Sequence, residues 1–222
     1  MLKAAIFDLD GLLIDSEPCW AVAEMAVLAE VGVPLTPEMC ARTVGLRIDE
    51  VVAYWHAQRP WSGPTVKDVT ARIVARMIDE LRERGQAKPG AQRAVERARR
   101  RGLAVGLASS SPMALIRAAV TRLGLDGAFD ALESAEDEAF GKPHPAVYLA
   151  AAARLHVAPT ACLALEDSVN GMIAAKAARM RCVLVPEHGP GDPRFGLADR
   201  VLGSLDELDD AAWAELDRPE PY

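Results

Sequence analysis

The chain has 222 residues, of which half are hydrophobic and 26% are charged, a composition that excludes disordered, collagen-like and low-complexity proteins. Its formal net charge of -7 excludes a global basic field, so we expect neither nucleic acid nor a membrane as a partner. No apolar stretch reaches the roughly 20 residues that cross a bilayer, and Met1 leads directly into a strand-like segment, so we expect a cytoplasmic protein.

The first predicted strand is the apolar run at residues 4–7, which ends in the sequence Asp8-Leu9-Asp10-Gly11. A spacing of two places both carboxylates on the same side of an extended chain, and Gly11 allows the backbone to turn sharply beneath them. Close carboxylates repel each other unless a cation or a proton lies between them. Because Mg²⁺ prefers oxygen ligands and commonly joins carboxylates to a phosphate, the pair indicates a magnesium site.

The segment that follows contains helical patterns only, at residues 20–31, 37–43, 48–58 and 66–84. Helix breakers gather around Asp15-Ser16 and Lys88-Pro89-Gly90, where the hydrophobic period changes, and we predict hinges there. The sequence therefore predicts a helical domain at residues 17–86, inserted into a core domain made of residues 1–16 and 87–222.

The rest of the chain alternates between two patterns. Short apolar runs predict buried parallel strands at residues 103–108, 162–165 and 182–185, with a final short strand at 200–202. Helical patterns lie before, between and after them, at residues 91–101, 112–123, 145–155 and 169–180. This alternation is typical of an α/β fold with a doubly wound parallel sheet.

Three serines follow the predicted strand at 103–108. The hydroxyl and N–H groups of Ser109, Ser110 and Ser111 lead into a helix whose N-terminus favours anions. We predict that Ser109 contacts a phosphate. Ser111 precedes Pro112 and is predicted to be the N-cap of that helix.

A lysine and an acidic pair lie at two further positions. Lys142 stands in the loop Gly141-Lys142-Pro143-His144-Pro145, where a fixed ammonium can neutralise carboxylate and phosphate oxygens. Glu166-Asp167 follows the strand at 162–165 and supplies a further ligand for a hard cation. Open parallel sheets bind ligands at the carboxyl ends of their strands, so we interpret this set as a site for a phosphate and a cation.

These residues, in this order, match the four motifs of the haloacid-dehalogenase-like superfamily. The chain resembles its β-phosphoglucomutase-like members, which carry a helical cap after the first motif. The resemblance implies two catalytic residues, Asp8 and Asp10. It implies a substrate-binding set of Asp8, Leu9, Asp10, Arg47, Ser109, Ser110 and Lys142. The metal-binding set that it implies is Asp8, Asp10, Asp167 and Glu166.

The resemblance also implies a mechanism. Asp8 attacks phosphorus to give an aspartyl phosphate, while Asp10 protonates the departing oxygen and then activates water. Mg²⁺, or another divalent cation such as Mn²⁺, is held by the Asp8 side chain, the Asp10 carbonyl and Asp167, with Glu166 as a weaker partner. The expected activity is a magnesium-dependent phosphatase, acting as a monomer on small sugar or sugar-alcohol phosphates such as hexitol phosphates and 2-deoxyglucose 6-phosphate.

Three other functions are compatible with parts of this pattern. A phosphosugar mutase of the β-phosphoglucomutase type carries a histidine where this chain has Trp20, which favours hydrolysis here. A non-hydrolytic phosphoacceptor module has no need for the helical insertion or for Asp10. A sugar-phosphate-binding module without activity has no need for both Asp8 and Asp10. In the cap, Arg47 lies in a segment that matches the substrate-facing loop of the family, and its five donors can meet sugar hydroxyls or phosphate.

Overall fold

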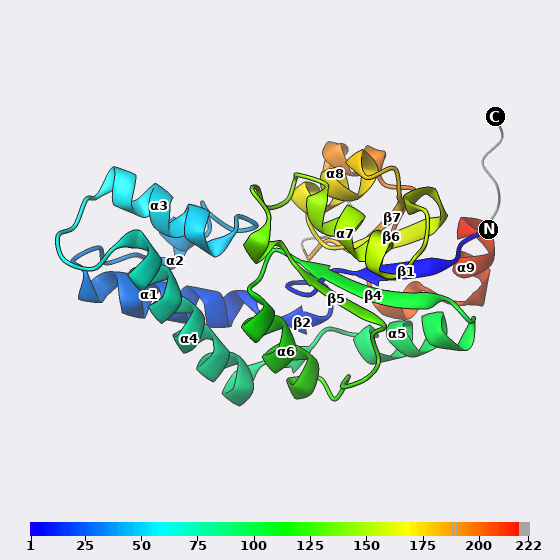
Figure 1. The fold of residues 1–222 in the computed structure, drawn as a ribbon, viewed down its shortest axis with the longest axis horizontal. Helices are drawn as coiled ribbons and strands as arrows, with labels where there is room; N and C mark the ends of the chain where they lie inside the picture. The colour runs from blue at the N-terminus through cyan, green and yellow to red at the C-terminus, as the bar shows by residue number, and fades with distance from the viewer. Residues whose placement is uncertain (188, 190, 218–222) are drawn as a thin grey trace.

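The computed structural model describes residues 1–187, 189 and 191–217. Its centre is a parallel sheet with the strand order β5-β4-β1-β6-β7-β8 (Figure 1). The strands are β1 (Ala4–Phe7), β4 (Ala104–Ser109), β5 (Ala131–Ser134), β6 (Cys162–Glu166), β7 (Arg181–Leu184) and β8 (Arg200–Val201). Strand β1 pairs with β4 on one side and with β6 on the other, in the register Ala4 to Ala104 and Ala4 to Cys162. The predicted doubly wound α/β fold is confirmed.

Helices cover both faces of the sheet, as Figure 1 shows. The core helices are α5 (Ala91–Arg100), α6 (Met113–Arg122), α7 (Ala146–Arg154), α8 (Val169–Ala177) and α9 (Asp210–Leu216). Ile6 of β1 packs into the core beneath α7 and α8, whereas Phe7 packs into the core shared with α5, α6 and α9. Successive residues of a strand face opposite sides of a sheet, so a strand covered on both faces is apolar throughout, as β1 is.

The helices that follow β1 form a lobe at the left of Figure 1. They are α1 (Glu17–Glu30), α2 (Pro37–Cys40), α3 (Ile48–Gln58) and α4 (Val66–Arg84). Helix α4 begins in a capping box, in which the Thr65 hydroxyl accepts from the Asp68 N–H and the Asp68 carboxylate accepts from the Thr65 N–H. Two short antiparallel strands, β2 (Ile14–Asp15) and β3 (Gln86–Ala87), join this lobe to the core.

Several elements differ from the sequence prediction. Strand β5 was not predicted, because this edge strand alternates buried and half-buried residues and includes Glu133 and Ser134 instead of forming an apolar run. Helix α9 was also missed, although Ala212, Trp213 and Leu216 are buried in the core. Short 3₁₀ helices lie at Ala135–Asp137, Pro159–Ala161, Pro193–Leu197 and Leu205–Glu207. Within the described residues, no helix has the length and apolar character needed to cross a membrane.

Candidate active site

The candidate site lies at the carboxyl ends of β1, β4 and β6. Because β1 lies between the other two strands, Asp8, Ser109 and Glu166 are brought to neighbouring positions at one edge of the sheet. A cavity of about 310 Å³ opens there between the sheet edge and helices α1 to α3. It is lined by most of the predicted site residues, namely Asp8, Asp10, Arg47, Ser109, Ser110, Lys142 and Asp167.

A buried ammonium joins two of the strand ends. Lys142 Nζ donates to Asp8 Oδ1 at 2.5 Å, to Glu166 Oε1 at 2.6 Å and to the carbonyl of Ala108 at 3.0 Å. The hydroxyl of Tyr148 donates to the same Glu166 oxygen at 2.6 Å. Burial alone lowers the pKa of a lysine, but the charges of Asp8 and Glu166 outweigh it and raise the pKa of Lys142 above its ordinary value. Lys142 therefore stays charged and holds Asp8 in place.

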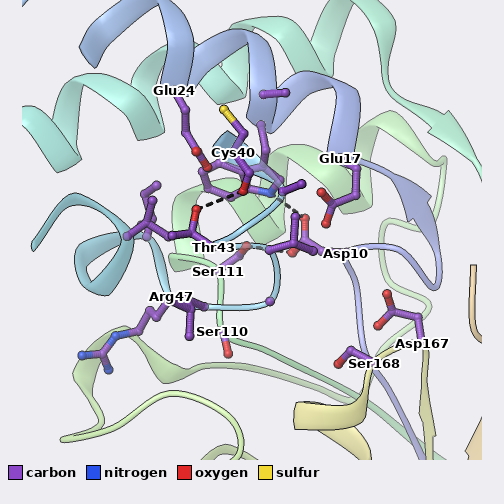
Figure 2. A pocket seen from close by; sticks show the side chains of 18 of the residues that line it. Asp10, Glu17, Glu24, Cys40, Thr43, Arg47, Ser110, Ser111, Asp167 and Ser168 are labelled. Carbon is purple, nitrogen blue, oxygen red and sulfur yellow. Dashed lines mark hydrogen bonds between the residues drawn. The ribbon is translucent and has the colours of Figure 1, made fainter. Parts of the chain in front are cut away.

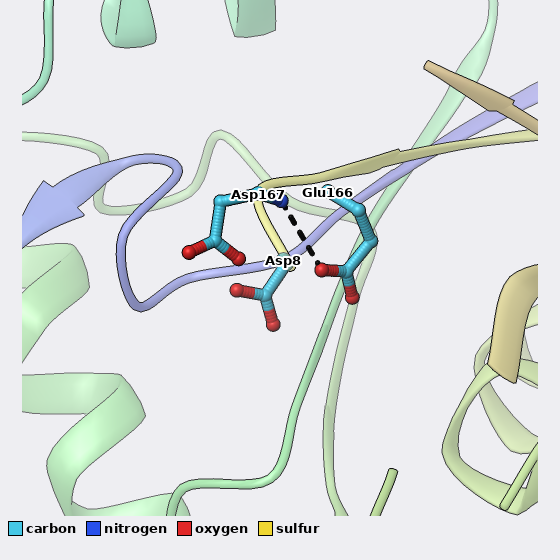
Figure 3. A group of neighbouring side chains, drawn as sticks. All are labelled: Asp8, Glu166 and Asp167. Atoms are coloured by element: carbon cyan, nitrogen blue, oxygen red, sulfur yellow. Dashed lines mark hydrogen bonds between the residues drawn. The ribbon is translucent and has the colours of Figure 1, made fainter. Parts of the chain in front are cut away.

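Three carboxyl groups lie close together beside the ammonium of Lys142. Carboxylate oxygens of Asp8, Glu166 and Asp167 lie within 4.8 Å of one another (Figure 3). Burial raises the pKa of Asp8 to about 8, with Lys142 opposing the rise and Glu166 adding to it. Burial, followed by repulsion from Asp8 and Glu166, raises the pKa of Asp167 well above its usual value. Crowded, buried carboxyl oxygens of this kind fit a divalent cation, whose charge would offset their mutual repulsion and favour their ionised forms.

The backbone leaves room for the Asp167 carboxylate. Gly11 has a φ of +76°, and a Cβ atom built there would lie 2.0 Å from Asp167 Oδ2. A side chain at this position would displace the carboxylate from the edge of the sheet. Gly11 is thus required both for its conformation and for its lack of a side chain.

Glu166 differs from the other two carboxylates in its contacts. It is fully buried, and both of its oxygens accept hydrogen bonds. Oε1 accepts from Lys142 and Tyr148, whereas Oε2 accepts from Asp167 N at 3.2 Å and from Ser168 Oγ at 3.3 Å. These contacts favour a role for Glu166 in fixing Lys142 over direct contact with a bound ion.

Asp10 faces the cap. Its Oδ1 accepts from the indole N–H of Trp20 at 3.2 Å, and its Oδ2 accepts from the hydroxyls of Ser109 at 3.3 Å and Ser111 at 2.7 Å (Figure 2). The prediction that Ser111 caps helix α6 is therefore wrong. The N-cap is Pro112, which has no side-chain capping bond, and the Ser111 hydroxyl binds the stronger carboxylate acceptor.

Arg47 lines the cavity, but its guanidinium points away from the carboxylates of the site (Figure 2). It donates to Asp49 at 2.6 and 2.8 Å and to the carbonyls of Ala135 and Glu138, in the core, at 2.9 and 2.7 Å. Most of the donors that the sequence assigned to substrate are therefore engaged, two of them by Asp49 within the cap and two by carbonyls of the core.

The remaining predicted residues have different surroundings. The Ser110 hydroxyl lies 3.5 Å from the backbone N of Lys142, from which it accepts. Leu9 is buried in the core, and its carbonyl accepts from the N–H groups of Leu13 and Ile14. Among the aromatic residues concentrated in the cap, Trp20 lines the cavity, whereas Trp55 is buried.

The residues of the cap wall of the cavity were not predicted from the sequence. Glu17, Glu24, Cys40 and Thr43 all line it. The available signal was helical spacing, because Glu24 lies four residues after Trp20 and must share its face of helix α1.

The profile of the haloacid dehalogenase-like hydrolase family matches residues 2–179. The chain belongs to this family. Among curated relatives of this hydrolase, hexitol phosphatase B of Escherichia coli strain K12 is 52% identical over 209 residues, covering 93% of this chain and 94% of the relative. The putative phosphatase YhcW of Bacillus subtilis is 34% identical and covers 94% of each chain.

Solved structures of the family have the same fold. CbbY from Rhodobacter sphaeroides, crystallised in complex with phosphate, superposes on this hydrolase with a TM-score of 0.89 at 27% identity, covering 98% of this chain and all of the other. A β-phosphoglucomutase from Clostridium difficile superposes with a TM-score of 0.83 at 22% identity, covering 97% of this chain and 96% of the other, and supports the fold alone.

Proposed function

We propose that this hydrolase is a magnesium-dependent phosphatase of small sugar or sugar-alcohol phosphates, including hexitol phosphates and 2-deoxyglucose 6-phosphate. Membership of the family and 52% identity to hexitol phosphatase B identify it as a phosphatase acting on phosphate monoesters. The observation that carries the proposal is the pairing of Asp8 with Lys142 at the floor of the cavity, with Asp10 beside it facing the cap.

The reaction has two steps in this proposal. An Asp8 carboxylate oxygen attacks phosphorus, and the bond from phosphorus to the sugar oxygen breaks, leaving an aspartyl phosphate. Asp10 gives its proton to the departing oxygen. In the second step Asp10 takes a proton from water, whose oxygen attacks phosphorus and releases phosphate from Asp8.

Three groups hold the phosphoryl oxygens. The donors are the hydroxyl of Ser109 and the backbone N–H of Ser110 at the end of β4, and the ammonium of Lys142 in the loop at residues 141–145. Lys142 is fixed by Glu166 and Tyr148 before substrate arrives, so little reorganisation is needed as charge moves in the transition state.

A divalent cation fits beside Asp8. The Asp8 and Asp167 side chains and the Asp10 carbonyl would hold Mg²⁺, and Mn²⁺ suits the same oxygen ligands. When bound, the ion supplies positive charge that offsets repulsion between carboxylates and phosphate. Glu166 belongs to this group through its hydrogen bonds to Lys142 and to Asp167 N.

Residues 17–86 act as a cap domain over the leaving group, with residues 1–16 and 87–222 as the core. We assign Arg47 to holding the cap against the core, because its guanidinium already binds two core carbonyls. The Trp20 indole binds Asp10, which favours hydrolysis over a mutase reaction. The substrates are small molecules, with no nucleic acid or membrane as partner. The protein acts as a cytoplasmic monomer.

A phosphate-release assay tests the proposal. The purified protein is given sorbitol 6-phosphate, mannitol 1-phosphate, 2-deoxyglucose 6-phosphate and a phosphopeptide, with Mg²⁺ or with a chelator. We expect release from the sugar phosphates with Mg²⁺, loss in chelator, and no release by Asp8→Asn. Preference for the phosphopeptide would refute the substrate class, and full activity in chelator would refute the metal requirement.

A further inference from the structure

A buried carboxyl group lies in the cap wall of the cavity, away from the residues that we propose to bind phosphate. Glu24 projects from helix α1 beside the thiol of Cys40, whereas Asp167 and Ser168 lie on the core side (Figure 2). Glu24 is only 7% exposed, and no nitrogen or oxygen donor among the described residues reaches its Oε2. The neighbouring thiol of Cys40 is a weak donor to the same carboxyl group. A buried carboxyl oxygen that accepts no strong hydrogen bond lowers the stability of the folded protein. A bound ligand could supply the missing donor.

The ionisable side chains of the cap wall are acidic. Glu17 and Glu24 both border it. Among the described residues that line the cavity, the cationic side chains are Arg47 and Lys142, and each is already engaged. Arg47 binds Asp49 and core carbonyls, and Lys142 binds Asp8 and Glu166. The cap end therefore offers carboxyl oxygens and no cation to a ligand.

Burial is visible in the pKa values of these two groups. Burial, with added repulsion from Glu17, raises the pKa of Glu24 to about 7. Burial, with added repulsion from Asp10 and with Lys88 opposing the rise, raises the pKa of Glu17 to about 7 as well. Above pH 7, where it is ionised, the Glu24 carboxylate accepts a hydrogen bond from a hydroxyl and repels a second anion placed beside it.

We propose that Glu24 is a specificity-determining residue, which binds a hydroxyl of the leaving group at the end remote from the phosphate and excludes substrates that carry a second anionic group there. This inference rests on the proposed sugar-phosphatase function. The preferred leaving group is a neutral, hydroxyl-bearing chain or ring. By contrast, a CbbY variant from Rhodobacter sphaeroides was crystallised in complex with xylulose 1,5-bisphosphate, a ligand with a phosphate at both ends.

Sorbitol 6-phosphate and 6-phosphogluconate make a matched pair for the test. They share the same carbon chain and phosphate, but the remote end is a neutral hydroxymethyl group in one and a carboxylate in the other. Two like charges about 5 Å apart at an effective dielectric constant near 20 repel strongly enough for discrimination of about 100-fold or more. At pH 8, where Glu24 is ionised, we expect wild type to prefer sorbitol 6-phosphate by a factor of this size in kcat/KM.

Glu24→Gln removes the charge but keeps the shape and a hydrogen-bond acceptor. We expect this variant to lower the preference for sorbitol 6-phosphate at least about tenfold, mainly by lowering KM for 6-phosphogluconate. Glu30→Gln is the matched control, since Glu30 lies on the same helix but its side chain is 61% exposed. The control is expected to keep the wild-type preference.

The outcomes separate this inference from the function on which it rests. Hydrolysis of sorbitol 6-phosphate without discrimination by wild type would overturn the role of Glu24 and leave the phosphatase proposal standing. An unchanged preference in Glu24→Gln would also overturn it. If wild type released phosphate from neither compound nor from any other sugar phosphate, the proposed sugar-phosphatase function itself would be refuted, and the role of Glu24 with it.

Discussion

Glu24→Gln is expected to stabilise the protein increasingly as the pH rises. Burial raises the pKa of Glu24 from 4.5 in the unfolded chain to about 7 in the folded protein. Between these values the folded state binds the proton more tightly, so the stabilisation from that proton is complete below pH 4.5 and is lost as pH rises through 7. Each pH unit in this window is worth about 1.4 kcal/mol, so the wild-type protein loses about 3 kcal/mol that the variant keeps.

Urea unfolding at pH 5 and pH 8 measures this difference. Part of the loss has already occurred at pH 5, so the stability advantage of Glu24→Gln is expected to grow by about 2 to 3 kcal/mol between the two conditions, with equal m-values. Glu30→Gln, on the exposed part of the same helix, should follow wild type. Parallel changes in stability for wild type and Glu24→Gln would refute the burial of an unpaired carboxyl group in the cap wall.

Three further variants test other contacts. Tyr148→Phe removes the hydroxyl that donates to Glu166 and should lower the free energy of unfolding by about 1 to 3 kcal/mol; an unchanged denaturation midpoint would contradict this. Arg47→Ala removes two hydrogen bonds from the cap to the core and should speed hydrogen exchange around residues 135–138; unchanged exchange would remove Arg47 from that role. Asp10→Asn should fold but lose at least about 100-fold in kcat on sorbitol 6-phosphate, because an amide cannot supply the proton; near-wild-type turnover would exclude Asp10 as the acid.

The floor of the site could be predicted from the sequence for a simple physical reason. Strands β1, β4 and β6 are buried on both faces, so each is an apolar run, and the polar residue that ends each run is conspicuous. Parallel strands bring those ends to one edge of the sheet. Asp8, Ser109 and Glu166 were placed together by this argument, without knowledge of any contact.

The cap side could not be predicted in the same way. Strand ends say nothing about where a long side chain points, and the five donors of Arg47 can reach either the cavity or the core carbonyls. The sequence pattern likewise predicted that the Ser111 hydroxyl caps the helix that follows it, whereas in the fold this hydroxyl donates to the Asp10 carboxylate. Glu24 was missed because an acidic residue on a helix is usually solvated, and its burial depends on how α1 packs beside Cys40.

The role of Asp8 as the residue that carries the phosphoryl group is tested by trapping that group on the protein. Asp10→Asn is mixed with Mg²⁺ and p-nitrophenyl phosphate, whose leaving group departs without an acid, while release of phosphate from the protein still requires the missing base. We predict a burst of one p-nitrophenol per protein molecule and the mass of one phosphoryl group on the peptide that contains Asp8. A burst without that adduct, or an adduct on another residue, would show that Asp8 does not carry the phosphoryl group.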